Sequence, residues 1–266
     1  MRMIQYTRFL CKWLIYKMFA GHRQGHGIHS PFLYRLVREV LMDKKSDTAF
    51  LLIESRRKAM LHHNKQLLYD DPGAGSTAIL RKARRVKNIA RTSAIRAKHG
   101  RLLFRLVRHF SPGSILELGT STGISTLYLG SACPAVPLIT IEAIESLSLL
   151  AKENAELIGL KNITFRIGMF DSQLGPALAE TKGDLLVFID GHHEKEATLA
   201  YVNRIIEGCT SNSLVILDDI HWSEGMEEAW KKICMHPAVT LSVDLFHMGL
   251  VFLRKELQQE CHLIRY

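Results

Sequence analysis

Two apolar runs in the second half of the chain, residues 184–190 and 213–219, end in carboxylates and are followed by histidines. Carboxylate oxygens suit hard divalent cations such as Mg²⁺, and a histidine can take up a proton near neutral pH. These positions therefore predict cation binding, proton transfer or both. The carboxylates are Asp190, Asp218 and Asp219, and the histidines are His192, His193 and His221.

A glycine turn at residues 114–126 is the second stretch with chemical potential. The apolar residues before Gly119 predict a buried strand, and the apolar run that resumes after Gly123 predicts a helix. Glycines allow a sharp turn close to a ligand, and a helix start favours a negatively charged group. The stretch therefore predicts a nucleotide-cofactor loop. It is not the dinucleotide fingerprint, because Ser121 and Ile124 replace two glycines, and no Gly-Lys-Ser/Thr follows as in a P-loop.

A wound sheet is the element that must position these residues. Further β-rich runs occupy residues 137–141 and 162–167, with helical segments between the strands. The carboxyl ends of strands in an open wound sheet form the ligand crevice, so we expect the carboxylates to gather beside the glycine turn. Glu142, about twenty residues beyond the turn, is expected to accept hydrogen bonds from both ribose hydroxyls. Gathered carboxylates are costly without a partner, which favours a bound cation.

Residues 114–126 resemble motif I of the class I S-adenosylmethionine-dependent methyltransferases, with an acid two residues before the first glycine. The turn is most similar to that of the small cation-dependent O-methyltransferases of the catechol and caffeoyl-CoA type. The resemblance covers about residues 92–256. It implies an α/β, Rossmann-like class I methyltransferase fold, with a mostly parallel seven-stranded sheet and a C-terminal antiparallel hairpin. It also implies S-adenosyl-L-methionine as cofactor, bound by Glu117, Gly119, Thr120, Ser121, Gly123, Ser125, Glu142, Phe170, Asp171 and Asp190.

The same resemblance suggests roles for the acids and histidines. In the family an Asp after strand four and an Asp pair after strand five hold the metal, which matches Asp190, Asp218 and Asp219. The family base is commonly a Lys three residues after the first Asp, where this chain has His193. His192 and His221 are alternatives as base or metal ligand. All three histidines could instead only cap helices or hydrogen-bond the carboxylates.

Two further stretches concern the edges of the predicted cofactor site. The family often has Gly-Asp-Ala where this chain has Gly168-Met169-Phe170, so Phe170 or Met169 would pack on the adenine and Asp171 would supply the polar contact. Thr92 and Ser93 open a predicted helix over residues 92–110. The resemblance implies that they lie beside cofactor and substrate, and otherwise they cap that helix.

The N-terminal part of the chain differs in charge from the remainder. Residues 1–110 carry 24 Lys and Arg against 6 Asp and Glu, a net +18, whereas residues 111–266 carry 11 against 20, a net −9. This predicts a basic, mainly helical extension over residues 1–91, joined to a methyltransferase domain over residues 92–266. Residues 4–19 suit an amphipathic helix that packs on its own domain or contacts a membrane surface or partner. The basic run 79–91 is interpreted as a solvated helix face, with polyanion binding as the alternative.

Composition limits the remaining classes. The chain has no stretch of 18 uncharged apolar residues, so no membrane span is expected. The five cysteines are scattered without a C-x-x-C pair, which favours a reduced, cytoplasmic protein over a zinc ribbon. The predicted function is methylation of a small-molecule hydroxyl, with Mg²⁺ as an assisting cation. The alternatives are methylation of RNA or another polyanion, and a non-catalytic binding protein of the same fold.

Overall fold

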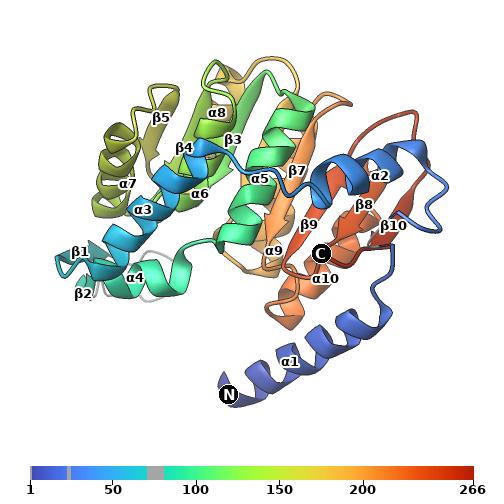
Figure 1. Cartoon of the computed structure of the whole chain (residues 1–266), viewed down its shortest axis with the longest axis horizontal. Helices are drawn as coiled ribbons and strands as arrows, with labels where there is room; N and C mark the ends of the chain where they lie inside the picture. Colours follow the sequence, from blue (N-terminus) through green and yellow to red (C-terminus); the bar gives the residue numbers. More distant parts are fainter. Residues whose placement is uncertain (1, 23–24, 71–80) are drawn as a thin grey trace. The chain divides into compact units, whose positions relative to one another are not determined.

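The structure is a computed structural model that describes residues 2–22, 25–70 and 81–266. Figure 1 labels the helices and strands of the chain. The chain divides into two compact units. The first unit comprises Met1–Lys44 and Asp184–Tyr266, and the second comprises Lys45–Gly183. Residues 70–76 contain Asp, Pro, Gly and Ser, a composition that predicts a loop, and all of them except Asp70 lie outside the described residues. The domain boundary at residue 91 stays a prediction.

Three parallel strands form the centre of the second unit. β3 pairs with β4, and β4 pairs with β5. All residues of β3 and β4 are buried, as expected for strands of a parallel sheet. A helix follows each strand, as the wound α/β prediction requires. The elements are β3 (Ser114–Leu118), α6 (Ile124–Ala132), β4 (Leu138–Glu142), α7 (Glu145–Leu157), β5 (Ile163–Ile167) and α8 (Phe170–Glu180).

Helices α3 (Thr48–His62) and α5 (Ala97–Phe110) pack with α6 in the second unit. Tyr128 of α6 is fully buried, and its hydroxyl donates a hydrogen bond to Oε1 of Glu54 over 2.7 Å. A Cβ atom at Gly100 would lie 2.3 Å from the Tyr128 ring, so α5 can approach α6 only through a glycine at this position. The tyrosine therefore fixes both neighbouring helices.

The basic run contains a strand, so its interpretation as one helix face is wrong. β1 (Gln66–Asp70) pairs in antiparallel register with β2 (Arg81–Arg85), and α4 (Val86–Ser93) follows directly. The extension predicted as mainly helical over residues 1–91 thus contains a β-hairpin, and its helix α3 ends at His62. Arg and Lys favour helices weakly, and pairing with a partner strand overrides such a preference. The buried side chain of Leu67 shows that this hairpin has a covered face.

The first unit contains the remaining strands, in the order β10-β8-β9-β7-β6. β6 and β7 are parallel, while β9 runs antiparallel to both β7 and β8, which confirms the predicted C-terminal hairpin. β10 adds an edge strand, parallel to β8, that the sequence did not suggest because its residues are mostly exposed. The elements are β6 (Leu185–Ile189), α9 (Lys195–Gly208), β7 (Leu214–Asp218), α10 (Glu224–Cys234), β8 (Leu241–Asp244), β9 (Met248–Phe252) and β10 (Glu260–Leu263).

Helix α1 (Arg2–Phe19) packs within the first unit. The buried Tyr16 hydroxyl donates to the carbonyl of Ile264 over 2.8 Å and accepts from the Tyr266 N–H over 2.7 Å. This attaches the helix to the C-terminal segment, as the prediction of a helix packed on its own domain requires. The opposite side of α1 is apolar and exposed, so contact with a membrane surface or partner stays open. The exposed residues include Leu10, Leu14, Ile15, Met18 and Phe19.

Two short helical segments follow α1, namely α2 (Pro31–Arg35) and η1 (Leu36–Leu41). The Ser30 hydroxyl accepts a hydrogen bond from the Leu33 N–H at the start of α2, and Pro31 occupies its first turn. Proline suits that position because its missing N–H would have no helical partner. In the part of the chain that the structure describes, none of the helices combines the length and apolar character needed to cross a bilayer.

Gly249 of β9 offers a test of packing in the first unit. A Cβ atom there would lie 2.4 Å from Cζ3 of the buried Trp230 ring, so we expect Gly249→Ala to reduce stability by about 1–3 kcal/mol. Gly225 in the first turn of α10 has ordinary space, 3.4 Å to Cβ of Lys195. Gly225→Ala should be neutral or stabilising by up to about 1 kcal/mol. Urea unfolding of both variants checks this, and equal midpoints would contradict it.

Candidate functional site

The glycine turn of the second unit connects β3 to α6 in a conformation that few residues adopt. Gly119, Ser121 and Gly123 all have positive φ angles, of 102°, 47° and 82°. A Cβ atom at Gly123 would lie 2.7 Å from Cβ of Ala151 on α7, so a side chain is excluded by space as well as by φ. The glycine therefore allows α7 to approach the start of α6, whose N-terminus carries a partial positive charge.

Glu142 at the end of β4 is hydrogen-bonded to this turn. Its Oε2 accepts from the Ser121 N–H over 2.8 Å, and its Oε1 accepts from the Ile144 N–H over 3.0 Å. Burial raises the pKa of Glu142, and the backbone N–H groups oppose that rise. Each carboxylate oxygen has a second lone pair that can accept a hydrogen bond from a hydroxyl group. The geometry is compatible with ribose binding, which stays a prediction.

Glu117 lies beneath the turn and is fully buried. Its Oε2 accepts hydrogen bonds from the hydroxyls of Thr126, over 2.5 Å, and Thr140, over 2.7 Å. The Thr120 hydroxyl lies 2.6 Å from that of Thr140. Burial raises the pKa of Glu117 to about 7, while hydroxyl contacts, including one from Ser125, oppose the rise. These side chains thus stabilise the turn through buried hydrogen bonds. Their direct contact with a cofactor stays a prediction.

Asn154 of α7 also holds the turn, and the sequence analysis did not identify it. Its buried Nδ2 donates to the carbonyl of Thr122 over 3.2 Å. Its Oδ1 accepts from Nη2 of Arg56 over 2.9 Å, which ties α3 to the same point. A lone asparagine in a predicted helix gave no signal of this role, because its partners are far away in the sequence.

Thr92 and Ser93 end α4 rather than begin a helix, so the prediction of one helix over residues 92–110 is wrong at its start. The Thr92 hydroxyl donates to the Asn88 carbonyl over 3.1 Å, and the Ser93 hydroxyl donates to the Ile89 carbonyl over 2.8 Å. Neither residue is an N-cap. Ser93 nevertheless lies beside the turn, with its Oγ 2.9 Å from Oγ of Ser121.

Phe170 and Asp171 form the first turn of α8, after the N-cap residue Met169. Asp171 is exposed. An acid in the first turn of a helix interacts favourably with the helix dipole, which gives Asp171 a structural reason for its position. The predicted contacts of both residues with adenine stay predictions.

The first unit holds the predicted acids and histidines. His193 is partly buried, with its Nε2 3.7 Å from Oδ1 of Asp190. Burial lowers the pKa of His193, and the nearby Asp219 carboxylate opposes that change. His192, with a φ of 53°, instead places its Nδ1 3.2 Å from the Tyr201 hydroxyl of α9. The two neighbouring histidines thus have different surroundings.

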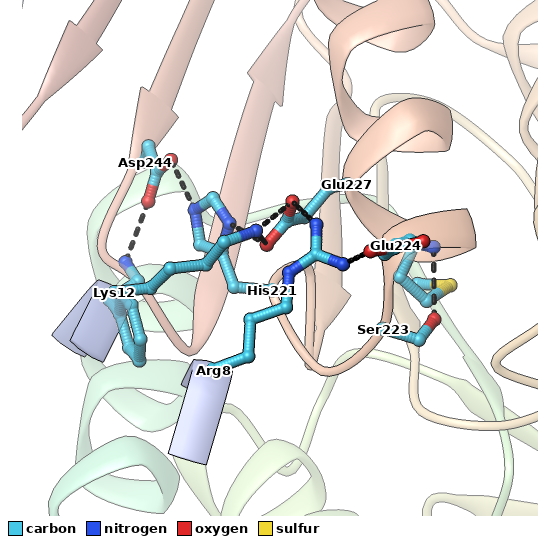
Figure 2. A network of polar contacts seen from close by, with 9 residues as sticks. Arg8, Lys12, His221, Ser223, Glu224, Glu227 and Asp244 are labelled. Carbon is cyan, nitrogen blue, oxygen red and sulfur yellow. Dashed lines mark hydrogen bonds and ion pairs between the residues drawn. The ribbon is translucent and has the colours of Figure 1, made fainter. Parts of the chain in front are cut away.

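His221 belongs to a network of charged side chains, shown in Figure 2. Its Nε2 lies 2.7 Å from Oδ2 of Asp244, and its Nδ1 lies 3.5 Å from Oε1 of Glu227. The Phe246 ring stacks on the imidazole with centroids 5.2 Å apart. Each ring nitrogen therefore faces a carboxylate, which is the arrangement expected of a histidine that holds structure together. Its role as a base or metal ligand stays a prediction.

Helix α1 supplies cations to the same network. Lys12 forms an ion pair with Glu227, and Arg8 forms one with Glu224 (Figure 2). Glu224 and Glu227 lie in the first turn of α10, where the helix dipole also favours acids. The sequence analysis missed Glu227 and Asp244, because neither belongs to a motif and their partners are remote in the chain.

The predicted metal ligands do not form a complete site. Among residues 2–22, 25–70 and 81–266, no three His, Cys, Asp or Glu side chains are grouped so that they could hold a metal ion. Asp219 has a φ of 53°, and its N–H donates to the His247 carbonyl over 2.6 Å. Asp190, Asp218 and Asp219 as ligands of Mg²⁺ therefore stay a prediction of the resemblance.

A family model described as a methyltransferase domain matches residues 116–220 of this chain. Residues 116–220 are therefore similar to a methyltransferase domain. The match begins in β3, includes the glycine turn and Glu142, and ends just after β7. It therefore contains all the cofactor-binding and metal-binding residues predicted from the sequence.

Curated relatives match shorter parts of the chain. The protein-L-isoaspartate O-methyltransferase of Magnetococcus marinus is 43% identical over 61 residues, which is 23% of this chain and 25% of that protein. The release factor glutamine methyltransferase of Aliivibrio fischeri is 34% identical over 98 residues, or 35% of this chain and 34% of that protein. The chain thus spans about a quarter to a third of these relatives.

A solved structure matches a much larger part of the chain. The O-methyltransferase from Bacillus cereus, in complex with S-adenosylhomocysteine, superposes with a TM-score of 0.56 at 18% identity. The superposition covers 83% of this chain and 96% of that chain. The likeness concerns the fold, and it confirms the predicted Rossmann-like class I methyltransferase fold.

The raised pKa of Glu117 predicts how stability depends on pH. The folded chain keeps this proton up to about pH 7, while an unperturbed Glu loses it near 4.5. Between these values the folded state binds more protons, so the stabilising contribution is present below pH 4.5 and is lost as pH rises through 7. The change is on the order of 3 kcal/mol. Glu117→Gln should remove this slope in denaturant unfolding from pH 4.5 to 8, whereas the exposed control Glu256→Gln should keep it.

Proposed function

We propose that this protein is an S-adenosylmethionine-dependent methyltransferase that methylates a hydroxyl oxygen of a small molecule. The observation that carries the proposal is the hydrogen bond from the Ser121 N–H to Glu142, 2.8 Å long. It brings the acid at the end of β4 to the glycine turn, inside the segment that matches a methyltransferase domain. The turn and the acid are the two features on which the cofactor prediction depends.

Bound S-adenosylmethionine supplies an electrophilic methyl group, and the residues of the chain supply position and proton transfer. Glu142 accepts hydrogen bonds from the ribose hydroxyls. The partial positive charge at the start of α6 attracts a negatively charged group of the cofactor. Direct displacement requires an oxygen in line with the methyl group, so positioning accounts for much of the rate. His193, which is partly buried beside Asp190, accepts the hydroxyl proton at a ring nitrogen. His221 is less suited to this role, because each of its ring nitrogens lies next to a carboxylate.

One observation favours polyanion methylation as the second candidate. Arg84 and Arg85 on β2 are both exposed, in a part of the chain with few acids. Binding of RNA through such residues should weaken steeply as salt increases. RNA affinity that is absent or insensitive to salt would leave the small-molecule acceptor as the favoured substrate class.

Cofactor binding tests the role of Glu142. Loss of a charged hydrogen-bond partner costs about 1.5–3 kcal/mol, so Glu142→Gln should weaken S-adenosylmethionine binding by about ten- to a hundredfold. The matched control is Glu145→Gln, three residues further on and exposed, which should bind as the wild type does. Calorimetry measures both. Equal affinities, with both variants folded, would refute the assignment, and no binding by the wild type would refute the proposed function itself.

The proton acceptor is tested separately from binding. His193→Ala should lower methyl transfer to catechol, used as a small hydroxyl probe, by about a hundredfold or more. The affinity for S-adenosylmethionine should remain within twofold, as expected when the transition state alone is affected. Transfer is followed as S-adenosylhomocysteine formed. A similar loss in His221→Asn but not in His193→Ala would assign the role to His221, and binding without transfer to any hydroxyl compound would favour the non-catalytic alternative.

A further inference from the structure

Two cysteines that are distant in the sequence meet at one edge of the first unit. Cys234 is the last residue of α10, and Cys261 lies in the edge strand β10. Their Sγ atoms are 3.9 Å apart, within hydrogen-bonding distance for sulfur. Cys261 is exposed, whereas Cys234 is partly buried behind it. The methyltransferase proposal uses neither residue.

The surroundings of the two thiols make them chemically unequal. The hydrogen bond between the two thiols lowers the pKa of Cys261 to about 6, and Ser242 and His262 lower it further, while burial and Asp244 oppose this. The same hydrogen bond, together with burial, raises the pKa of Cys234. A thiolate is the nucleophile in disulfide exchange. The exposed cysteine is therefore the attacking group and the partly buried cysteine is the second, resolving thiol.

We infer that Cys234 and Cys261 form a modification site, a dithiol that oxidises reversibly to an intramolecular disulfide by exchange with a small disulfide such as oxidised glutathione. The contact between the two Sγ atoms and the exposure of Cys261 carry this inference.

The exchange balances without any further reactant. Sγ of Cys261 attacks one sulfur of oxidised glutathione, whose disulfide bond breaks to release one glutathione thiolate. Sγ of Cys234 then attacks Sγ of Cys261, its proton passes to solvent, and the second glutathione leaves as a thiolate. Both released thiolates take up a proton at neutral pH. The dithiol loses two electrons, and one oxidised glutathione becomes two reduced molecules.

Closure of the disulfide requires only a local movement. The sulfur atoms must approach by about 2 Å to reach bonding distance. Cys261 lies in a strand of four residues that pairs only with β8 among the described strands, and Cys234 lies at a helix end. Both positions can adjust more readily than residues inside the sheet. The bond would join the end of α10 to β10.

The test uses the full chain equilibrated in buffers of defined ratios of reduced to oxidised glutathione. After acid quenching and alkylation, mass spectrometry should find a peptide that links Cys234 to Cys261, and reduction should abolish it. Cys234→Ser should instead retain glutathione on Cys261, while Cys261→Ser should leave Cys234 largely unmodified. Cys11→Ser, which removes an exposed cysteine of α1, is the matched control and should form the disulfide as the wild type does.

Three results would overturn the inference. The first is absence of the linked peptide at every glutathione ratio in the folded wild type. The second is an equal rate of alkylation at Cys234 and Cys261 in the reduced protein, where we expect a difference of about tenfold or more. The third is a mixed disulfide on wild-type Cys261 that does not resolve. Circular dichroism of each serine variant distinguishes lost reactivity from lost folding.

Discussion

The parallel register of β3 and β4 is the constraint on which the glycine turn of the second unit depends. Leu118 lies opposite Ile141, and the Gly119 N–H continues the ladder by donating to the Ile141 carbonyl over 3.0 Å. Just beyond that bond the two strands end together, so the glycine turn and Glu142 necessarily meet. A shift of the register by one residue would also move buried side chains to the opposite face of the sheet. The position of the acid is thus determined by strand pairing as much as by its own hydrogen bonds.

Glu117 shows why this part of the fold could be predicted from the sequence only in outline. The resemblance implies that Glu117, the acid before the first glycine, binds the cofactor. In the structure this side chain is buried and accepts hydrogen bonds from threonine hydroxyls. Burial of an ionised carboxyl is costly, which is why its pKa rises to about 7 despite those donors. Local patterns specify strand, turn and helix. The direction of a side chain within the turn depends on partners such as Thr140, which local patterns do not identify.

The histidines illustrate the same difference at the ends of β6 and β7. Both strands end in acids and are followed by histidines, so the local pattern makes His193 and His221 both candidates for the catalytic base. Their surroundings differ because His221 lies between Glu227, six residues further on, and Asp244, which comes from the more distant strand β8. Long-range pairing also explains the unpredicted hairpin of β1 and β2, where strand pairing overrides a basic sequence that favours a helix. Apolar strands and glycine turns were predictable, whereas pairings between remote polar residues were not.

Charge totals are informative only when the partners of each charge are known. The first 110 residues carry a net +18, which suggested a basic appendage. Arg8 and Lys12 nevertheless pair with acids of α10, and Tyr16 attaches the same helix to the C-terminal segment. Helix α1 is therefore part of the first unit, and part of its positive charge is neutralised there. Any polyanion would have to be bound mainly by other basic residues, such as the exposed Arg84 and Arg85, so the net charge alone does not favour a nucleic-acid substrate over a small molecule.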